Sequence, residues 1–391
     1  MSAISVVHII DHMGLGGVQT LLRAMLPHLP AHGYAPTLIS LRGETDLSRG
    51  LADSGVPVRS LGLPKWSPAQ LPHLVAELRR LRPLIVHTHL TVGNLLGRSA
   101  AIITGTPVIV MEEQVSLSQD VYGLPPLVAL AGRLAEPYLG RHTARYIGPS
   151  QIVMAASRTA KGWPDDKCRV RYNAVDCVRF APVADRRVAR THLGIPERLT
   201  VATLGRFVPQ KRITDVVEVA RRVLPQFPDV QFLIGGGGPQ EQEIDAAIAA
   251  AQLGDRVLML GRRDDSECIL AASDIYLSVS AGEVLSIAIL EAMASGCPVV
   301  ATRAGGTAEQ VTPGVNGSLT AVADLDGLAN ELLALLRDPA LREKQSQASR
   351  HLALQRFDLP TVAAAQAAIY DELCAIPRRA SYAGTPREAS S

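Results

Sequence analysis

Short apolar segments alternate with longer amphipathic ones along almost the whole chain, and this alternation limits the fold more than any other feature. In the first half, the apolar runs predict strands at residues 4–10, 37–41, 58–61, 84–87, 108–111, 145–147 and 169–172. The segments between them predict helices at residues 18–30, 68–81, 92–104, 125–140 and 151–161. Because strands and helices follow each other in turn, the sequence predicts a parallel, doubly wound α/β sheet.

A second α/β unit follows a break in this alternation. Residues 173–197 contain two prolines and a cluster of arginines, which indicates a hinge. Beyond it we expect strands at residues 200–204, 230–234, 256–260, 275–279 and 299–301, and helices at residues 213–225, 240–252, 265–272, 285–295, 325–337, 340–350 and 359–375. Two such halves facing each other would hold their ligands in the cleft between them, at the carboxyl ends of the strands.

The expected domain division follows from this pattern. We assign an N-terminal domain to residues 1–178 and a C-terminal domain to residues 199–357, with the hinge at 179–198. The helix at 358–375 is expected to complete the N-terminal domain. Residues 376–391 are rich in Pro, Arg, Ser and Ala, a composition typical of a flexible tail.

Composition limits the class of protein. The 391 residues are long enough for two domains, and 47% hydrophobic with 19% charged residues fits a soluble globular protein. Aromatic residues make up only 4%, so a base-stacking platform, and with it a nucleic-acid partner, is not expected. The five cysteines form no Cys-x-x-Cys pair, the N-terminus lacks the basic start of a signal peptide, and no window holds 18 uninterrupted apolar residues. We therefore expect a cytoplasmic protein with reduced thiols.

Charge is unevenly distributed between the two halves. Residues 1–180 hold 18 Lys and Arg against 12 Asp and Glu, whereas residues 181–391 hold 21 against 25. A net charge of +6 on the first half could attract anionic lipid or an acidic acceptor, or it could be a scatter of solvated arginines. Residues 121–140 are apolar with Arg133 and Arg141 near one side, which fits either a membrane-surface element or an ordinary core-facing helix. A peripheral contact with the inner membrane is therefore one of two interpretations.

Two carboxylates flank a predicted buried helix in the second half. Glu283 lies at its start and Glu291 inside it, and Gly296 with Pro298 ends it. Eight residues of helix rise about 12 Å, and the helix N-terminus between the carboxylates would offer N–H groups to phosphates. A buried carboxylate needs a partner, so we expect one for Glu291; alternatively, Glu291 lies on a solvent-exposed stripe of the helix.

Two loops at strand ends carry features that suit phosphate. Arg206 and Lys211 follow the strand that ends at Leu204, and Gly205 allows a close approach. The alternative is a pair of surface bases at an ordinary turn. The first loop, residues 12–19, is rich in glycines that let backbone N–H groups reach a phosphate. It is not the dinucleotide-binding fingerprint, because Gln19 stands where the third glycine belongs.

The order of these motifs resembles the retaining glycosyltransferases of family 4, which have the GT-B fold. That fold consists of two Rossmann-like, doubly wound parallel-sheet domains facing a central cleft. The resemblance covers most of residues 5–375. It rests on Gly16-Gly17, Gly148-Pro149-Ser150, residues 172–176, Gly205-Arg206 with Lys211, residues 235–239, Glu283 with Glu291, residues 298–302, Gly305-Gly306, Glu309 and Asn316-Gly317.

The resemblance implies a hexosyltransferase that moves a sugar, with retention, from a nucleotide-diphosphate sugar to a hydroxyl of a polysaccharide, lipopolysaccharide or lipid-linked glycan. The C-terminal domain would bind the nucleotide sugar and the N-terminal domain the acceptor. Arg206 and Lys211 would neutralise the leaving diphosphate, while Glu283 would hold the donor sugar and Glu291 the ribose. Further donor contacts are implied for Gly16 and Gly17 on the diphosphate, Gly205, the N–H groups of Ser286 and Ile287, and Arg262 at the base.

The sequence shows no histidine cluster with ligand spacing, so neither a metal nor a cofactor beyond the donor is expected. The sequence departs from the family where Val284 and Ser286 replace two glycines, and where Glu113 occupies the position of a histidine that touches the donor sugar. Glu113 could accept from a sugar hydroxyl or activate the acceptor, or it could mark altered specificity or impaired catalysis. His87 and His89 end another strand, where lone histidines are more often structural.

Two further functions stay open from the sequence. One is a nucleotide-sugar epimerase on the same fold, and the other is a non-catalytic homologue that serves as an assembly subunit. A glycoside hydrolase that uses Glu283 and Glu291 is a weaker alternative, because it would give no role to the basic loop of the second domain.

Overall fold

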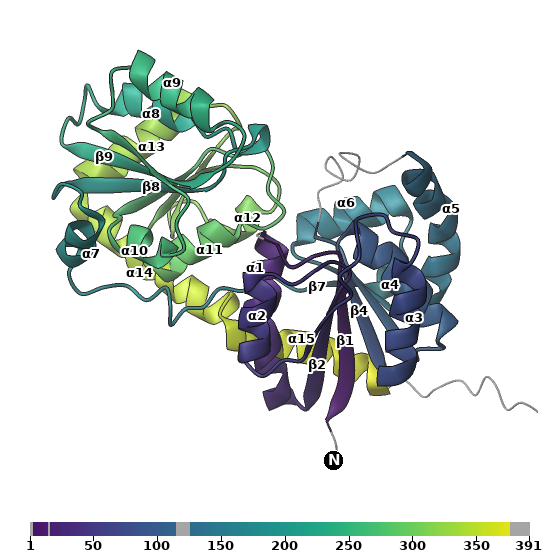
Figure 1. Ribbon diagram of the computed structural model, residues 1–391. Helices are drawn as coiled ribbons and strands as arrows, with labels where there is room; N and C mark the ends of the chain where they lie inside the picture. The colour runs from purple at the N-terminus through teal and green to yellow at the C-terminus, as the bar shows by residue number, and fades with distance from the viewer. Residues whose placement is uncertain (1–2, 15, 115–125, 376–391) are drawn as a thin grey trace, which may run out of the picture.

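The computed structural model describes residues 3–14, 16–114 and 126–375, and they form two α/β domains that lie side by side (Figure 1). Each domain has one fully parallel sheet with helices on both of its faces. The predicted α/β class with two doubly wound sheets is confirmed. The predicted flexible tail lies outside the described residues.

The first sheet has seven strands in the order β3-β2-β1-β4-β5-β6-β7. Their bounds are β1 (Ile4–Ile10), β2 (Tyr34–Ser40), β3 (Val58–Ser60), β4 (Ile85–His89), β5 (Val108–Glu112), β6 (Arg145–Gly148) and β7 (Cys168–Val170). Both faces of β1 are buried, with Val6 and Ile10 in one core and Val7 and Ile9 in another. A strand buried on both faces explains why this segment is apolar throughout rather than alternating.

The helices of the first domain are α1 (Gly17–Met25), α2 (Asp46–Asp53), α3 (Gln70–Leu81), α4 (Thr91–Ile103), α5 (Pro126–His142) and α6 (Gln151–Lys161). The helix predicted at 18–30 is shorter than expected. It ends at Met25 and continues as a 3-10 segment, η1 (Leu26–His32). Pro27 and Pro30 explain the change, because proline lacks the N–H that an α-helix requires.

The second sheet has six strands in the order β10-β9-β8-β11-β12-β13. They are β8 (Leu199–Arg206), β9 (Val230–Gly237), β10 (Val257–Gly261), β11 (Ile275–Ser278), β12 (Val299–Thr302) and β13 (Gly317–Thr320). Its helices are α8 (Thr214–Val223), α9 (Glu241–Ala250), α10 (Ser266–Ala271), α11 (Ile287–Ala294), α12 (Thr307–Gln310), α13 (Leu325–Arg337) and α14 (Pro339–Arg356). The segment predicted as a hinge, 179–198, contains helix α7 (Arg186–Leu193), whose N-cap is Asp185.

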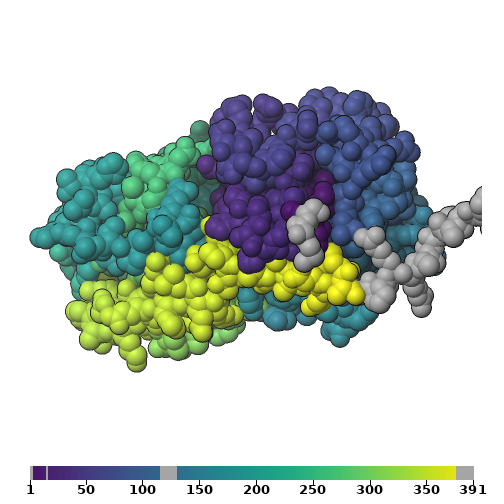
Figure 2. Space-filling model, turned by 90° about the horizontal axis from the view of Figure 1, so that it is seen from below, coloured from purple at the N-terminus to yellow at the C-terminus, as the bar shows by residue number. Residues whose placement is uncertain are grey.

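The chain crosses between the domains twice. After α14 it returns to the first domain as α15 (Leu359–Ala375), and α14 and α15 form one yellow band along both domains (Figure 2). Tyr370 and Leu373 of α15 lie in the same core as Val6 and Ile10 of β1. The two crossings meet where Val175 pairs with Asp358.

Candidate functional site

A lysine and a glutamate meet at the carboxyl edge of the second sheet. Lys211 ends the turn η3 (Pro209–Lys211) after β8, and Glu283 follows β11. Lys211 Nζ donates to Glu283 Oε1 at 2.5 Å, and Ser280 Oγ donates to the same oxygen at 2.7 Å. Because β8 and β11 are neighbours in the sheet, their carboxyl ends bring together residues that are far apart in the chain. A cation is thereby held where a ligand would enter the cleft.

Two arginines lie exposed at strand ends of the same sheet. Arg206 is the last residue of β8, and it makes no ion pair or side-chain hydrogen bond with any residue in the described ranges. Arg262 follows β10 and lies beside Gly237, since a Cβ on that glycine would be 3.8 Å from the Arg262 Cβ. Both guanidinium groups are available to an anionic ligand.

The loop between Glu283 and helix α11 packs directly on a pair of glycines. A Cβ on Gly305, whose φ is +51°, would come within 2.0 Å of the Glu283 carbonyl oxygen. A Cβ on Gly306 would come within 2.1 Å of the Val284 carbonyl oxygen, and the Gly306 N–H donates to the Glu283 carbonyl at 3.0 Å. Only glycines fit there, so this pair sets how closely the loop between Glu283 and α11 packs against residues 305–306.

One predicted phosphate donor is already engaged. The Ser286 N–H donates to Gln310 Oε1 at 3.0 Å, and Gln310 Nε2 donates back to the Ser286 carbonyl at 2.7 Å. The Ser286 N–H is therefore engaged within the protein, and its contact with a phosphate stays a prediction. Ile287 is the first residue of α11, so its N–H lies at the helix N-terminus. Sequence reasoning missed Gln310, because an amide that binds one peptide group has no fixed spacing from it along the chain.

The glycine loop of the first domain reaches across to this helix. Gly17 begins α1, and a Cβ on it would lie 3.3 Å from Ile287 Cδ1, so the two domains touch here. A Cβ on Gly16 would lie 2.4 Å from Gln19 Oε1, while Gln19 Nε2 donates to the His12 carbonyl at 3.3 Å. The structure thus brings the predicted Gly16-Gly17 pair against the start of α11.

Glu291 lies half-buried on α11 and has no hydrogen bond or ion pair with any residue in the described part of the chain. The partner expected within the protein is not found. Burial raises the pKa of the Glu291 carboxyl to about 7, and the positive charge of Arg179 only partly opposes this shift. The carboxyl is left able to bind a ligand hydroxyl as donor or acceptor.

Glu113 has a different environment from the other predicted site residues. It follows β5, is buried, and pairs with Lys161 in the last turn of α6. Its N–H donates to the Ile147 carbonyl at 2.8 Å. The structure therefore anchors Glu113 within the first domain, and its contact with a donor sugar or acceptor stays a prediction.

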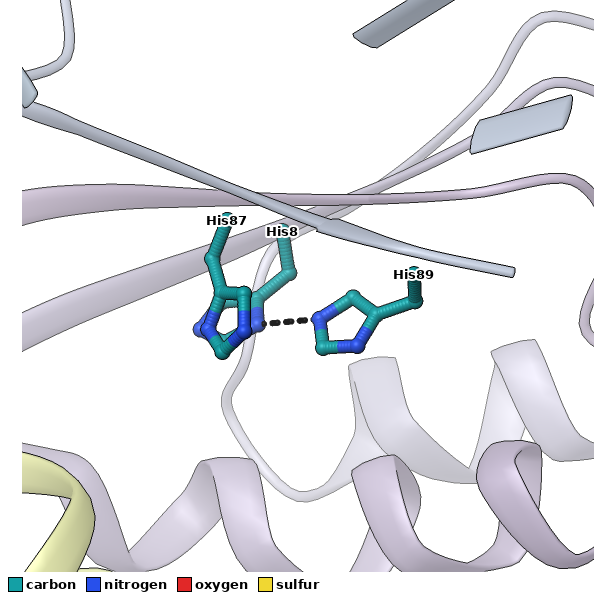
Figure 3. Close-up of side chains that lie close together, drawn as sticks. All are labelled: His8, His87 and His89. Carbon is teal, nitrogen blue, oxygen red and sulfur yellow. Dashed lines mark hydrogen bonds between the residues drawn. The ribbon is translucent and has the colours of Figure 1, made fainter. Parts of the chain in front are cut away.

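Three histidines converge in the first domain, although the sequence showed no such cluster. The rings of His8 from β1 and of His87 and His89 from β4 point toward one another (Figure 3). All three are fully buried, and their ligand atoms lie within 4.8 Å of one another, close enough to hold a metal ion. Spacing along the chain missed the group because His8 comes from a separate strand.

Hydrogen bonds within the protein account for this cluster. His8 Nδ1 lies 2.9 Å from His89 Nε2, and Glu112 Oε2 lies 3.1 Å from His89 Nδ1 and 3.4 Å from His87 Nε2. Arg171 pairs with the other oxygen of Glu112. Burial lowers the pKa of His8 well below its usual value and that of His87 to about 4, so these rings are neutral. The guanidinium already neutralises the carboxylate, which disfavours a second cation, and the structural interpretation of His87 and His89 fits best.

The cluster connects to the cleft through side chains that the sequence analysis did not single out. Gln114 donates to Glu112, and its Nε2 also lies 3.2 Å from Asn173 Oδ1. Asn173 Nδ2 donates across the domain boundary to the Leu285 carbonyl at 2.9 Å. The loop at the mouth of α11 is therefore held from the first domain as well as from Gly305 and Gly306.

A second contact between the domains uses a carboxylate at a helix start. Glu309 of α12 accepts from the N–H groups of Gln151 and Ile152 at 2.9 and 3.0 Å. These N–H groups open α6, where a negative charge is favourable. Glu309 belongs to the motifs on which the family resemblance rests, and here it joins one domain to the other.

Comparison with known families agrees with the motifs. Residues 15–179 match the family described as Glycosyltransferase Family 4, and residues 185–352 match the family described as Glycosyl transferases group 1. The two matches meet near the hinge, so each covers one domain.

Two curated relatives are each 30% identical to this chain over the matched region. One is an N-acetyl-alpha-D-glucosaminyl L-malate synthase of Bacillus anthracis, matched over 53% of this chain and 54% of that protein. Another is the lipopolysaccharide core biosynthesis mannosyltransferase LpcC of Rhizobium leguminosarum bv. viciae, matched over 60% of this chain and 68% of that protein. The matched region thus spans little more than half of the first relative and about two thirds of the second.

Solved structures share the fold. An Anabaena HepE protein in complex with UDP superposes with a TM-score of 0.82 at 22% identity, covering 94% of this chain and 100% of that one. A glycosyltransferase of Rickettsia africae superposes with a TM-score of 0.80 at 18% identity, covering 96% and 100%. With a family match on each domain and a mannosyltransferase matched over two thirds of its length, this chain belongs to the family 4 glycosyltransferases and has their GT-B fold.

Proposed function

We propose that the protein transfers a hexose, with retention, from a nucleotide-diphosphate sugar to a hydroxyl of a glycan or lipid-linked acceptor. The observation that carries this proposal is that the Lys211–Glu283 pair and the exposed Arg206 share the carboxyl edge of the second sheet. The two cations, Lys211 and Arg206, suit the diphosphate of such a substrate, and the Glu283 carboxylate suits the hydroxyls of its sugar.

The site would work mainly through charge. As the glycosidic bond to the diphosphate breaks, negative charge grows on the leaving phosphate, and Lys211 with Arg206 would stabilise it. Glu283 would then accept from hydroxyls of the sugar, and Glu291 would bind the ribose. Two fixed protein cations can supply the charge that a metal supplies in other transferases, which supports a metal-independent transfer.

The relatives guide the choice of acceptor. One is named a UDP-Gal:alpha-D-GlcNAc-diphosphoundecaprenol alpha-1,3-galactosyltransferase, from Escherichia coli, and LpcC is named for lipopolysaccharide core biosynthesis. These names support a lipid-linked or lipopolysaccharide acceptor for this chain, in a cytoplasmic enzyme that works at the inner membrane. The net charge of +6 on residues 1–180 is favourable for that placement.

The experiment begins with the donor. Thermal shift against UDP-, GDP- and ADP-sugars should raise Tm with one nucleotide class, because a ligand that binds only the folded state stabilises it. The same donor is then incubated with and without lipid-linked acceptors, in buffer containing EDTA. Glycosylated acceptor with the anomeric configuration of the donor retained is the expected product. A converted donor sugar in the absence of acceptor would identify an epimerase, and donor binding without consumption across the acceptor panel would identify a binding subunit.

A further inference from the structure

Helix α5 carries an exposed apolar stripe on the outer side of the first domain. Leu130, Leu134 and Tyr138 are exposed and spaced four residues apart, so they lie on one face of the helix. Leu134 is 73% exposed. Figure 1 places α5 at the edge of the first domain, on the side away from the second domain. The stripe is therefore separate from the donor site.

The charged residues on this face share one sign. Arg133 and Arg141 are exposed beside the stripe, and His142 follows at the end of the helix. Between residues 130 and 142 no carboxylate is exposed, because the only acidic residue there, Glu136, is half-buried and bonded to Arg98 at 3.1 and 2.5 Å. An apolar stripe flanked only by cations is complementary to a surface of anionic headgroups above hydrocarbon.

We propose that α5 lies in the interface of an anionic lipid bilayer, with its apolar stripe buried among the headgroups and its arginines on the lipid phosphates. Among the described residues, none of the helices is long and apolar enough to cross a membrane. Tyrosine suits this depth, since its ring is apolar and its hydroxyl remains hydrated. The inference rests on the proposed function only in explaining why a lipid surface is relevant.

A second copy of the chain fits this face less well. A stable protein interface takes about 20–30 residues on each side, whereas α5 exposes eight residues between 130 and 142. Three apolar side chains are also too few to bind a neutral bilayer firmly, so the arginines must contribute. The expected behaviour is thus binding that depends on anionic lipid and weakens with salt.

Co-sedimentation with lipid vesicles tests the proposal on the full chain. Vesicles of phosphatidylcholine alone are compared with vesicles of equal parts phosphatidylcholine and phosphatidylglycerol. The protein should bind the anionic vesicles at least about tenfold more strongly, since each arginine near such a surface contributes on the order of 1 kcal/mol. Equal binding to both vesicle types, or to neither, would overturn the proposal.

Variants locate the contact. Leu134→Glu and the double variant Arg133→Glu/Arg141→Glu should each weaken binding by about tenfold or more. The matched control is Val188→Glu on α7 of the second domain, where Val188 is 70% exposed, and its binding should stay within about twofold of the unchanged protein. Equal losses in Leu134→Glu and Val188→Glu would contradict a specific role for α5.

Two further measurements separate this inference from others. Gel filtration with light scattering should give one mass for the unchanged protein and for Leu134→Glu; a dimer that disappears in the variant would instead assign the stripe to a second copy. Thermal shift with the nucleotide-sugar panel should be the same in both proteins, because α5 lies outside the donor site. If the donor panel fails while vesicle binding follows the pattern above, the lipid contact stands and the proposed transfer does not.

Discussion

The two sheets of this protein use the polar residues at their carboxyl ends in different ways. In the first domain, Glu112 is fully buried and its oxygens meet Arg171, His87 and His89. In the second domain, Glu291 has no partner among the described residues and Arg206 is exposed. The same architecture thus supports a closed network that stabilises the fold and an open set of charges that can receive a ligand.

Burial and pairing explain the difference in protonation. Burial alone would raise the pKa of Glu112, but the charge of Arg171 and the hydrogen bonds from the two rings hold it well below its usual value. Glu291 lacks such partners, and burial raises its pKa to about 7. One carboxylate is held in its charged form by an internal cation, and the other has a pKa near neutral and no internal partner among the described residues.

Removing the cation from the buried network around Glu112 should have the largest effect on stability. Arg171→Met leaves the Glu112 carboxylate buried without its cation, which should lower the free energy of unfolding by about 3–5 kcal/mol. Denaturant unfolding measures this change. The double variant Arg171→Met/Glu112→Gln should recover much of the loss, because no unpaired charge remains.

The exposed pair Arg187–Asp185 provides the control for that comparison. Their side chains are 72% and 41% exposed, so Arg187→Met should change the free energy of unfolding far less than Arg171→Met does. A loss for Arg171→Met no larger than that of the control would show that the buried network does not stabilise the first domain.

Removing a cation from the open site should affect turnover rather than folding. Lys211→Ala should lower kcat by about 10²–10³-fold, if Lys211 stabilises charge on the leaving phosphate. Steady-state kinetics with the donor found by thermal shift measures this change, and Lys344→Ala on the exposed face of α14 is the control. Near-normal turnover in Lys211→Ala would remove the lysine from the proposed mechanism.

Replacing Glu291 should have a smaller effect on stability, and in the stabilising direction. Its folded pKa of about 7 lies above its value in the unfolded chain, so its contribution to stability is present at low pH and is lost as pH rises through 7. Glu291→Gln should therefore stabilise the unliganded protein above pH 7, by at most about 3 kcal/mol, with the gain falling to about 1 kcal/mol at pH 5. The same variant should bind donor more weakly if Glu291 holds the ribose.

Melting curves at pH 5 and pH 8, with and without donor, measure both effects at Glu291. Glu331→Gln, an exposed change on α13, is the control. If Glu291→Gln raises Tm at pH 8 without weakening donor binding, the buried carboxylate destabilises the fold but does not hold the nucleotide.

The sequence predicted the fold well because buried parallel strands are short apolar runs that stand out between amphipathic helices. It also placed Lys211 after one predicted strand and Glu283 at the start of a buried helix, although only the structure shows that the two strands are neighbours. It could not predict that Gln310 engages the Ser286 N–H, because such a contact depends on the tertiary position of a short helix. The histidine cluster was missed for a related reason: only the strand order places β1 beside β4.

The return of the chain to the first domain as α15 has a consequence for biosynthesis. The first core contains Tyr370 and Leu373, so this domain lacks part of its interior until α15 has left the ribosome. The second domain, whose strands are all made before α15, can fold first. At typical elongation rates roughly ten seconds or more separate synthesis of β7 from that of α15, an interval in which the nascent N-terminal half is exposed to chaperones.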